Sequence, residues 1–139
     1  EAIEIPKPHS QTYISSYKVS KRRELDISAV SAACALRLNA EQEIEYVRLA
    51  YGGMAATPLR AYAVEESILG KQLTDAVIAD AVSAMKTAFT PMDDHRGSAW
   101  YRSTLAANLL CGFLMEYREN LPVGYPDRPS ATVLSGGAS

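Results

Sequence analysis

Hydrophobic and polar residues alternate along much of the first third of the chain, with the period of a strand that has one buried face. One alternating run covers residues 12–19, and two more cover residues 27–38 and 44–51. The polar residues 39–42 between the last two runs predict a hairpin turn. The alanines within residues 27–38 also suit a helix, so the pattern alone leaves both structures open there.

The spacing of apolar residues changes to the period of a helix after Gly52 and Gly53, whose backbone freedom ends the third strand. Thr57 and Pro58 then predict the N-cap and the first residue of a helix. Gly70 is the expected end of this helix, because glycine readily takes the backbone conformation that follows a last turn.

Two longer helices are predicted next, one from Thr74 or Asp75 to Pro91 and one that is capped by Ser98. The last helix carries a wide apolar stripe along Tyr101, Leu105, Leu109 and Phe113, flanked by Ala106, Leu110, Leu114 and Tyr117. Strands followed by helices predict an α+β domain. We expect an antiparallel sheet of three to four strands, followed by three helices packed on one face.

The chain of 139 residues has the length of one domain. Residues 1–119 are predicted to form this domain, and residues 120–139, rich in Pro, Gly and Ser, a tail or linker. The chain opens at Glu1, beside the strand-like residues 3–5 and without an initiator methionine. We therefore expect it to be a piece of a longer protein.

The net charge of −2 and the pI of about 5.7 exclude a protein that wraps nucleic acid. Cys34 and Cys111 have neither CxxC nor Cys/His spacing, which indicates no zinc site and no disulfide framework. Two buried free thiols fit a reducing compartment. No signal pattern is present, and no apolar run reaches the roughly 18 residues that span a bilayer. A cytoplasmic protein without a membrane partner is expected.

The strongest local charge lies in the basic segment, residues 17–28, with the sequence YKVSKRRELDIS. Its cations are Lys18, Lys21, Arg22 and Arg23. They must face water, an anion or a cofactor, because unpaired cations are not buried. Two interpretations stay open. Either the segment is a solvated turn whose arginines pair with Glu24 and Asp26, at about 1 kcal/mol or less per pair, or Lys18 points from the end of its strand toward an anionic cofactor.

Other candidate chemistry is sparse, since no serine stands in a nucleophile motif and His9 and His95 are the only histidines. Residues 93–96, Asp-Asp-His-Arg, would need ligands from elsewhere to bind a metal. We interpret them as a solvated loop whose carboxylates favour the start of the following helix. Gly52-Gly53 lacks the lysine of a phosphate-binding loop and is interpreted as a turn. No residue is assigned a catalytic or metal-binding role.

Three segments in register resemble a known family: YKVSKRRELDIS at residues 17–28, YGGMAATPLRA at residues 51–61 and PMDDHRGSAWYR at residues 91–102. In this order and spacing the chain, from Ile3 to about Tyr117, resembles the C-terminal domain of the FAD-binding subunit of bacterial xanthine dehydrogenase. This domain belongs to the molybdenum hydroxylases and is similar to that of the CO dehydrogenase flavoprotein. The resemblance implies an antiparallel sheet covered by three helices, in agreement with the periodicity.

The resemblance also implies a place in an electron-transfer chain. In the xanthine dehydrogenases of this family a molybdenum cofactor hydroxylates the substrate, and electrons pass through iron-sulfur clusters to FAD and then to NAD. FAD is held mainly by a preceding domain that is absent here, so this chain would cover one side of the flavin and be inactive alone. The implied partners are that upstream FAD-binding domain and the subunits or domains that bind the iron-sulfur clusters and molybdenum.

Lys18 matches the family position whose lysine contacts the flavin, and a cation there would favour the reduced flavin. Leu25 stands where the animal relatives have an acidic residue, so the charge-based switch between NAD and oxygen is not carried over. Two alternatives remain. The chain is a structural module that docks subunits through its apolar last helix without touching the cofactor, or it is the flavin domain of a related hydroxylase with another substrate.

Overall fold

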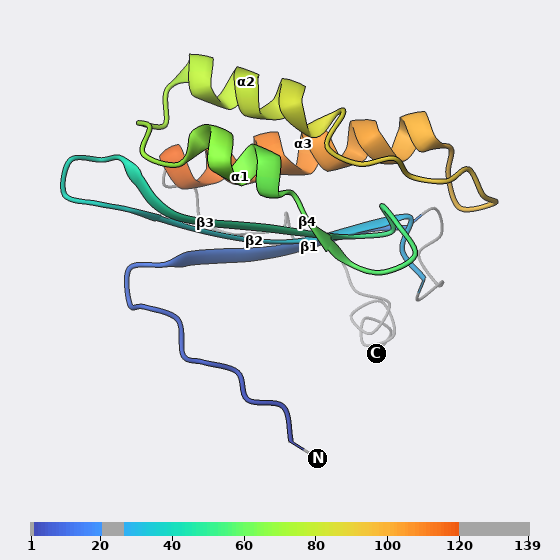
Figure 1. Cartoon of the computed structure of the whole chain (residues 1–139), viewed down its shortest axis with the longest axis horizontal. Coiled ribbons are helices and arrows are strands. Elements are labelled where there is room, and N and C mark those ends of the chain that lie inside the picture. Colours follow the sequence, from blue (N-terminus) through green and yellow to red (C-terminus); the bar gives the residue numbers. More distant parts are fainter. Residues whose placement is uncertain (1, 21–26, 120–139) are drawn as a thin grey trace, which may run out of the picture.

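In the computed structural model, which describes residues 2–20 and 27–119, a four-stranded sheet carries three helices on one face (Figure 1). The strands are β1 (Tyr13–Val19), β2 (Val30–Leu38), β3 (Ile44–Gly52) and β4 (Leu59–Arg60). The helices are α1 (Tyr62–Ile68), α2 (Asp75–Met85) and α3 (Ala99–Arg118). The predicted α+β class, with its antiparallel sheet followed by three helices, is therefore confirmed.

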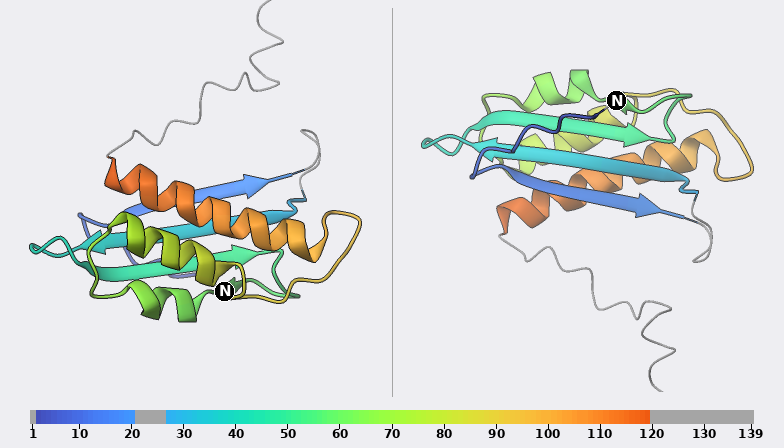
Figure 2. Two further views of the ribbon diagram at one scale, coloured as in Figure 1. Left: turned by 90° about the horizontal axis from the view of Figure 1, so that it is seen from above. Right: turned by 90° about the horizontal axis from the view of Figure 1, so that it is seen from below.

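The four strands lie in chain order, and every neighbouring pair is antiparallel. Residues 30–38, for which a helix was an alternative, form the central strand β2 because their alternate side chains bury one face. The buried side chains of this strand are Val30, Ala32, Cys34 and Leu36. One face of the sheet is thus apolar and covered by helices, while no helix of the described residues lies on the other, which we call the open face (Figure 2).

The core lies between the sheet and the helices. Helix α3 packs across β1 and β2, α1 packs on β3, and α2 packs against α1 and α3. Side chains from both layers fill the space, and the largest fully buried ones are Tyr51 of β3 and Phe113 of α3. The buried side of α3 is centred on the residues predicted to flank its stripe, with Ala106, Leu110 and Leu114 fully buried. Leu105 and Leu109 are only partly buried.

The predicted start of the first helix at Thr57 and Pro58 is wrong. Leu59 and Arg60 form the edge strand β4, which pairs with Ala50 and Tyr51 of β3. The backbone N–H of Ala61 then donates to the carbonyl of Leu49 at 2.9 Å, so α1 begins only at Tyr62. Pairing with a long neighbouring strand therefore outweighs the local Thr-Pro signal.

Buried Glu65 explains why the chain pairs with β3 at this point. One oxygen of its carboxylate accepts the backbone N–H of Leu49 at 2.7 Å and the Nε of Arg60 at 3.1 Å. The other oxygen forms an ion pair with the guanidinium of Arg60. Because α1 carries Glu65, this contact ties the helix to both β3 and β4.

The two predicted N-caps, Thr74 and Ser98, are confirmed. The hydroxyl of Thr74 accepts the N–H of Val77 at 3.3 Å, and that of Ser98 accepts the N–H of Tyr101 at 3.1 Å. Helix α2 ends at Met85 and not at the predicted Pro91, because residues 86–88 close in tighter turns onto the preceding carbonyls.

Three further expectations concern single segments. Residues 3–5 form no strand and lie exposed in the N-terminal segment that leads away from the sheet (Figure 1). Cys34 is buried as expected, whereas Cys111 is only half-buried. The predicted tail, residues 120–139, lies outside the described residues. Of the helices that the structure describes, none has the length and apolarity to cross a membrane.

Candidate functional site

A shallow hollow lies on the open face of the sheet, at the end where β1 finishes and β2 begins. We call it the open-face hollow; its volume is about 450 Å³, within the roughly 300–1,000 Å³ of small-molecule sites. Its floor is made of the outward-facing residues Ser16, Lys18, Ser31, Ala33, Ala50 and Gly52, and Pro58 stands at its side. Apart from Lys18, these side chains are small and leave room for a flat group to lie against the strands.

Strand register explains how residues distant in sequence form this floor. Lys18 of β1 pairs with Ser31 of β2, which pairs in turn with Gly52 of β3. A Cβ atom at position 52 would stand 2.5 Å from the hydroxyl oxygen of Ser31, so a larger residue there would force the Ser31 side chain to move. The hydroxyl of Ser31 makes no hydrogen bond within residues 2–20 and 27–119. The three paired residues therefore offer one cation and one hydroxyl group beside an open floor.

Lys18, the predicted site residue, is exposed on the outer side of β1 and lines the hollow. It makes no ion pair with the residues that the structure describes. Lys21, Arg22 and Arg23, like Glu24, Leu25 and Asp26, fall on residues 21–26, which lie outside the described residues. The idea that those arginines pair with Glu24 and Asp26 stays a prediction.

Sequence reasoning missed Arg102, which lies directly behind the hollow at the start of α3. Its side chain is 6% exposed, and its guanidinium donates to the carbonyl oxygens of Ala29 at 2.7 Å and Gly53 at 2.6 Å. A second nitrogen donates to the carboxylate of Asp94 at 2.6 Å. The sequence signal for this contact was a cation four residues before Ala106, on the helix row that continues through Leu110 and Leu114.

The loop of residues 93–96 thus has more structure than the predicted solvated loop. Asp93 accepts the N–H of Ala99, the first residue of α3, which agrees with the expected effect of a carboxylate at a helix start. Hydrogen bonding from Arg102, and then from the backbone N–H of Arg96, lowers the pKa of Asp94 from 3.8 to about 2. Within the described ranges, no three His, Cys, Asp or Glu side chains come together as a metal site.

The other end of the open face is filled by large side chains. The guanidinium groups of Arg37 and Arg48 lie over the ring of Tyr46, at 5.2 Å and 4.6 Å from its centre. Arg37 also forms an ion pair with Glu45. This stack covers the strands with its own side chains, so it leaves no floor like that of the hollow.

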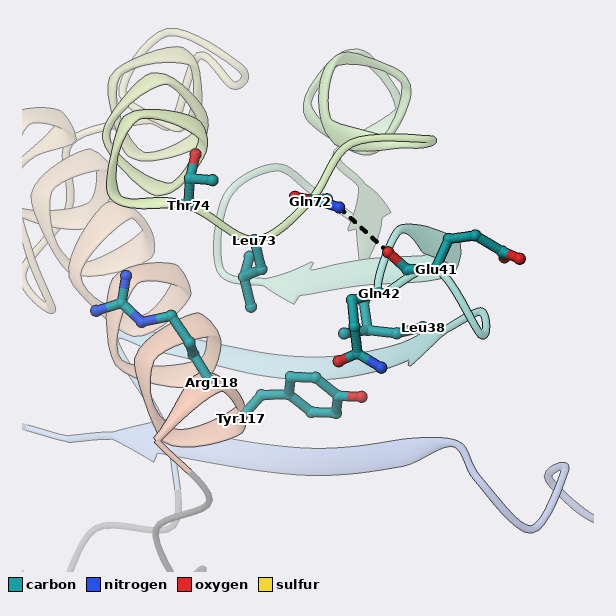
Figure 3. Close-up of a pocket in the computed structure, with 8 residues that line it drawn as sticks. All are labelled: Leu38, Glu41, Gln42, Gln72, Leu73, Thr74, Tyr117 and Arg118. Carbon is teal, nitrogen blue, oxygen red and sulfur yellow. Dashed lines mark hydrogen bonds between the residues drawn. The ribbon is translucent and has the colours of Figure 1, made fainter.

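A second pocket lies between the hairpin that joins β2 to β3, the segment before α2 and the end of α3 (Figure 3). Gln72 donates across it to the carbonyl of Glu41 at 3.2 Å. Arg118 at its edge is already engaged in an ion pair with Asp75. None of the described residues in the three resemblance segments lines this pocket.

Comparison with known proteins finds relatives that match most of this chain. The family model of the CO dehydrogenase flavoprotein C-terminal domain matches residues 15–117. Glyceraldehyde dehydrogenase medium chain of Sulfolobus acidocaldarius is 40% identical over 99 residues, which are 71% of this chain and 35% of that protein. Xanthine dehydrogenase of Emericella nidulans is 29% identical over 123 residues, 87% of this chain and 9% of that protein.

The solved structures agree with the sequence relatives. Carbon monoxide dehydrogenase from Hydrogenophaga pseudoflava superimposes with a TM-score of 0.69 at 25% identity, over 78% of this chain and 37% of the matched chain. The protein described here thus spans about a third or less of the length of its relatives. The match over residues 15–117 shows that the chain belongs to the CO dehydrogenase flavoprotein C-terminal domain family of the molybdenum hydroxylases.

Proposed function

We propose that this chain is the C-terminal part of the FAD-binding subunit of a xanthine dehydrogenase-like molybdenum hydroxylase, and that its open sheet face covers one side of the flavin. The observation that carries the proposal is the open-face hollow, where Lys18 stands beside a floor of small side chains. Both the lysine and the floor lie within the residues that the family model matches.

The residues of the hollow fit a flavin. A planar ring needs a flat floor, and the small side chains of Ala33 and Ala50, with Gly52, supply one. A ring edge with carbonyl oxygens needs donors, and the ammonium of Lys18 and the hydroxyl of Ser31 are both available. When bound, FAD would accept electrons from iron-sulfur clusters and pass them to NAD.

Lys18 would act by charge. A fixed ammonium group beside a carbonyl edge stabilises negative charge at that edge, which is how a protein tunes the electronics of a flavin. The exposed position of Lys18 on β1 keeps its ammonium group hydrated until a partner covers the hollow. Covering the hollow lowers the local dielectric and strengthens the effect of the charge.

The remaining parts of the proposed enzyme lie outside this chain. An upstream domain would hold most of the FAD, and other subunits or domains would hold the iron-sulfur clusters and the molybdenum cofactor. We assign a cytoplasmic enzyme of purine metabolism with xanthine as substrate and NAD as acceptor. The names of the relatives include xanthine and glyceraldehyde dehydrogenases. An aldehyde is therefore the competing substrate class, and it would be selected at the molybdenum site.

The test is to replace Lys18 by Met in the complete enzyme and measure the flavin midpoint potential. Losing the cation disfavours the reduced flavin, so the potential falls by about 30 mV if the charge is worth about 1.4 kcal/mol in a two-electron couple. Lys86→Met is the matched control, since Lys86 is equally exposed but lies at the end of α2 on the helical side. The control leaves the potential unchanged.

An unchanged potential in Lys18→Met would remove the electrostatic role and favour the alternative, a subunit-docking module without cofactor contact. The same preparation separates the substrate classes, because NADH forms on addition of xanthine if the assignment is right. NADH formation with an aldehyde alone would assign the enzyme to the other class.

A further inference from the structure

We infer that Arg102 is a positioning residue for the open-face hollow, acting from the helical side through the backbone of Ala29 and Gly53. The inference rests on the proposed function, because it concerns the geometry of the same flavin site. Arg102 does not itself line the hollow.

The two carbonyls that Arg102 holds belong to segments that end the floor of the hollow. Ala29 comes two residues before Ser31, and Gly53 follows Gly52 directly. One nitrogen of the guanidinium bonds both carbonyls, at 2.7 Å and 2.6 Å. A single side chain therefore links the residue before β2 to the residue after β3, next to the pair of Ser31 and Gly52.

The contact also reaches β1, which carries Lys18. The backbone N–H of Ala29 donates to the carbonyl of Val19 at 2.8 Å. Val19 is the last residue of β1 and the neighbour of Lys18. A shift of Ala29 is therefore passed on to the end of the strand from which Lys18 projects.

Glycine at position 53 is part of the same arrangement. Gly53 has a φ of +82°, and a Cβ there would stand 2.4 Å from the carbonyl oxygen of Ala29. A side chain at position 53 would push apart the two carbonyls that share Arg102. We call Arg102 with the two carbonyls that it holds the clamp. The second glycine of the Gly52-Gly53 pair thus belongs to the clamp, while the first belongs to the floor of the hollow.

Asp94 completes the clamp by balancing the charge. A guanidinium that is only 6% exposed requires acceptors, because an unpaired buried cation is costly. Asp94 accepts from Arg102 at 2.6 Å and also from the backbone N–H of Arg96 at 2.8 Å, which fixes the orientation of its carboxylate. The loop before α3 therefore holds Arg102 in the geometry that both carbonyls need.

The experiment compares Arg102→Met, Arg102→Lys and Asp94→Asn in the complete enzyme. We measure the affinity of the FAD-depleted enzyme for added FAD, the flavin midpoint potential, and hydrogen exchange of the backbone amides at residues 29–31 and 52–54. Arg118→Met is the matched control, because Arg118 lies on the same helix and its ion pair with Asp75 is exposed and far from the hollow.

We expect Arg102→Met to weaken FAD binding about tenfold, the size expected for one lost hydrogen bond to a charged group, and to speed exchange at both segments. Arg102→Lys recovers part of the affinity, since its ammonium group keeps the charge but cannot make all the hydrogen bonds of the planar guanidinium. In a Lys18→Met background, the shift in potential caused by Arg102→Met becomes smaller, because the clamp acts through the position of Lys18.

The outcomes separate the inference from the proposed function. If Arg102→Met and Arg102→Lys leave both affinity and potential as in Arg118→Met, while Lys18→Met still shifts the potential, the inference fails and the proposed function stands. If Lys18→Met has no effect but the Arg102 variants still weaken FAD binding, the role of Lys18 fails and the positioning role stands. Should Arg102→Met not fold, Arg102→Lys and Asp94→Asn carry the same comparison.

Discussion

The two ends of the open sheet face are built from the same strands but differ in side-chain size. At one end Ser31, Ala33 and Gly52 leave a hollow. At the other end Arg37 and Arg48 stack on the ring of Tyr46 and cover the strands. A sheet face that no helix covers is therefore not a binding surface throughout. The volume of its outward side chains decides where a flat group can approach the strands.

The two ends also differ in the partners of their cationic side chains. At the filled end, Arg37 has a carboxylate partner in Glu45 as well as the ring of Tyr46. At the hollow end, Lys18 has no ion pair within the described part of the chain. A cation with partners in the same domain stabilises that domain, whereas Lys18 is the cation that we propose to act on a bound flavin.

The largest expected effect comes from filling the hollow. Ala33 is exposed at its centre, so Ala33→Leu adds bulk where the flavin would lie without disturbing the core. Overpacking costs about 1–3 kcal/mol, which corresponds to roughly tenfold or more in FAD affinity. FAD titration of the depleted complete enzyme measures this loss.

Ala35→Leu is the control for this substitution. Ala35 lies two residues further along β2, on the same face, but outside the lining of the hollow. FAD binding stays at the wild-type level there. Equal losses in both variants would mean that the hollow is not the place where the flavin lies.

A smaller effect is expected from removing the stack at the filled end. Tyr46→Ala loses two contacts between a cation and a ring, each worth about 0.5–1 kcal/mol at an exposed site. The free energy of unfolding falls by about 1 kcal/mol in chemical denaturation, while FAD affinity is unchanged. A loss of FAD binding would extend the site across the whole open face.

The smallest expected effect is a stability difference behind the hollow that disappears in acid. Arg102 lowers the pKa of Asp94 from 3.8 to about 2, so folding favours the ionised carboxylate. The stability that Asp94 contributes is complete above about pH 3.8 and is lost as the pH falls toward about 2. Melting temperatures of the wild type and Asp94→Asn therefore differ at neutral pH and converge in acid. A constant difference across this range would show that the charge of Asp94 does not support the clamp.

Much of the fold followed from local patterns. Alternation over residues 44–51 predicted β3, and Thr74 and Ser98 predicted the starts of α2 and α3, because each signal depends on neighbours within a few residues. The short strand β4 was missed. Its pairing with Ala50 and Tyr51 depends on a strand that ends seven residues earlier in the chain, and the Thr-Pro pair gave a stronger local signal.

The candidate site was predicted only in part for the same reason. Lys18 could be picked from the sequence because it ends an alternating run and matches a family position. The sequence by itself determined β1, β3, the starts of α2 and α3 and the face of β1 on which Lys18 lies, since periodicity and capping act between near neighbours. Only the tertiary structure decided which residues lie beside Lys18. Register joined Ser31 and Gly52 to it, and Arg102 reached Ala29 across 73 positions of the chain.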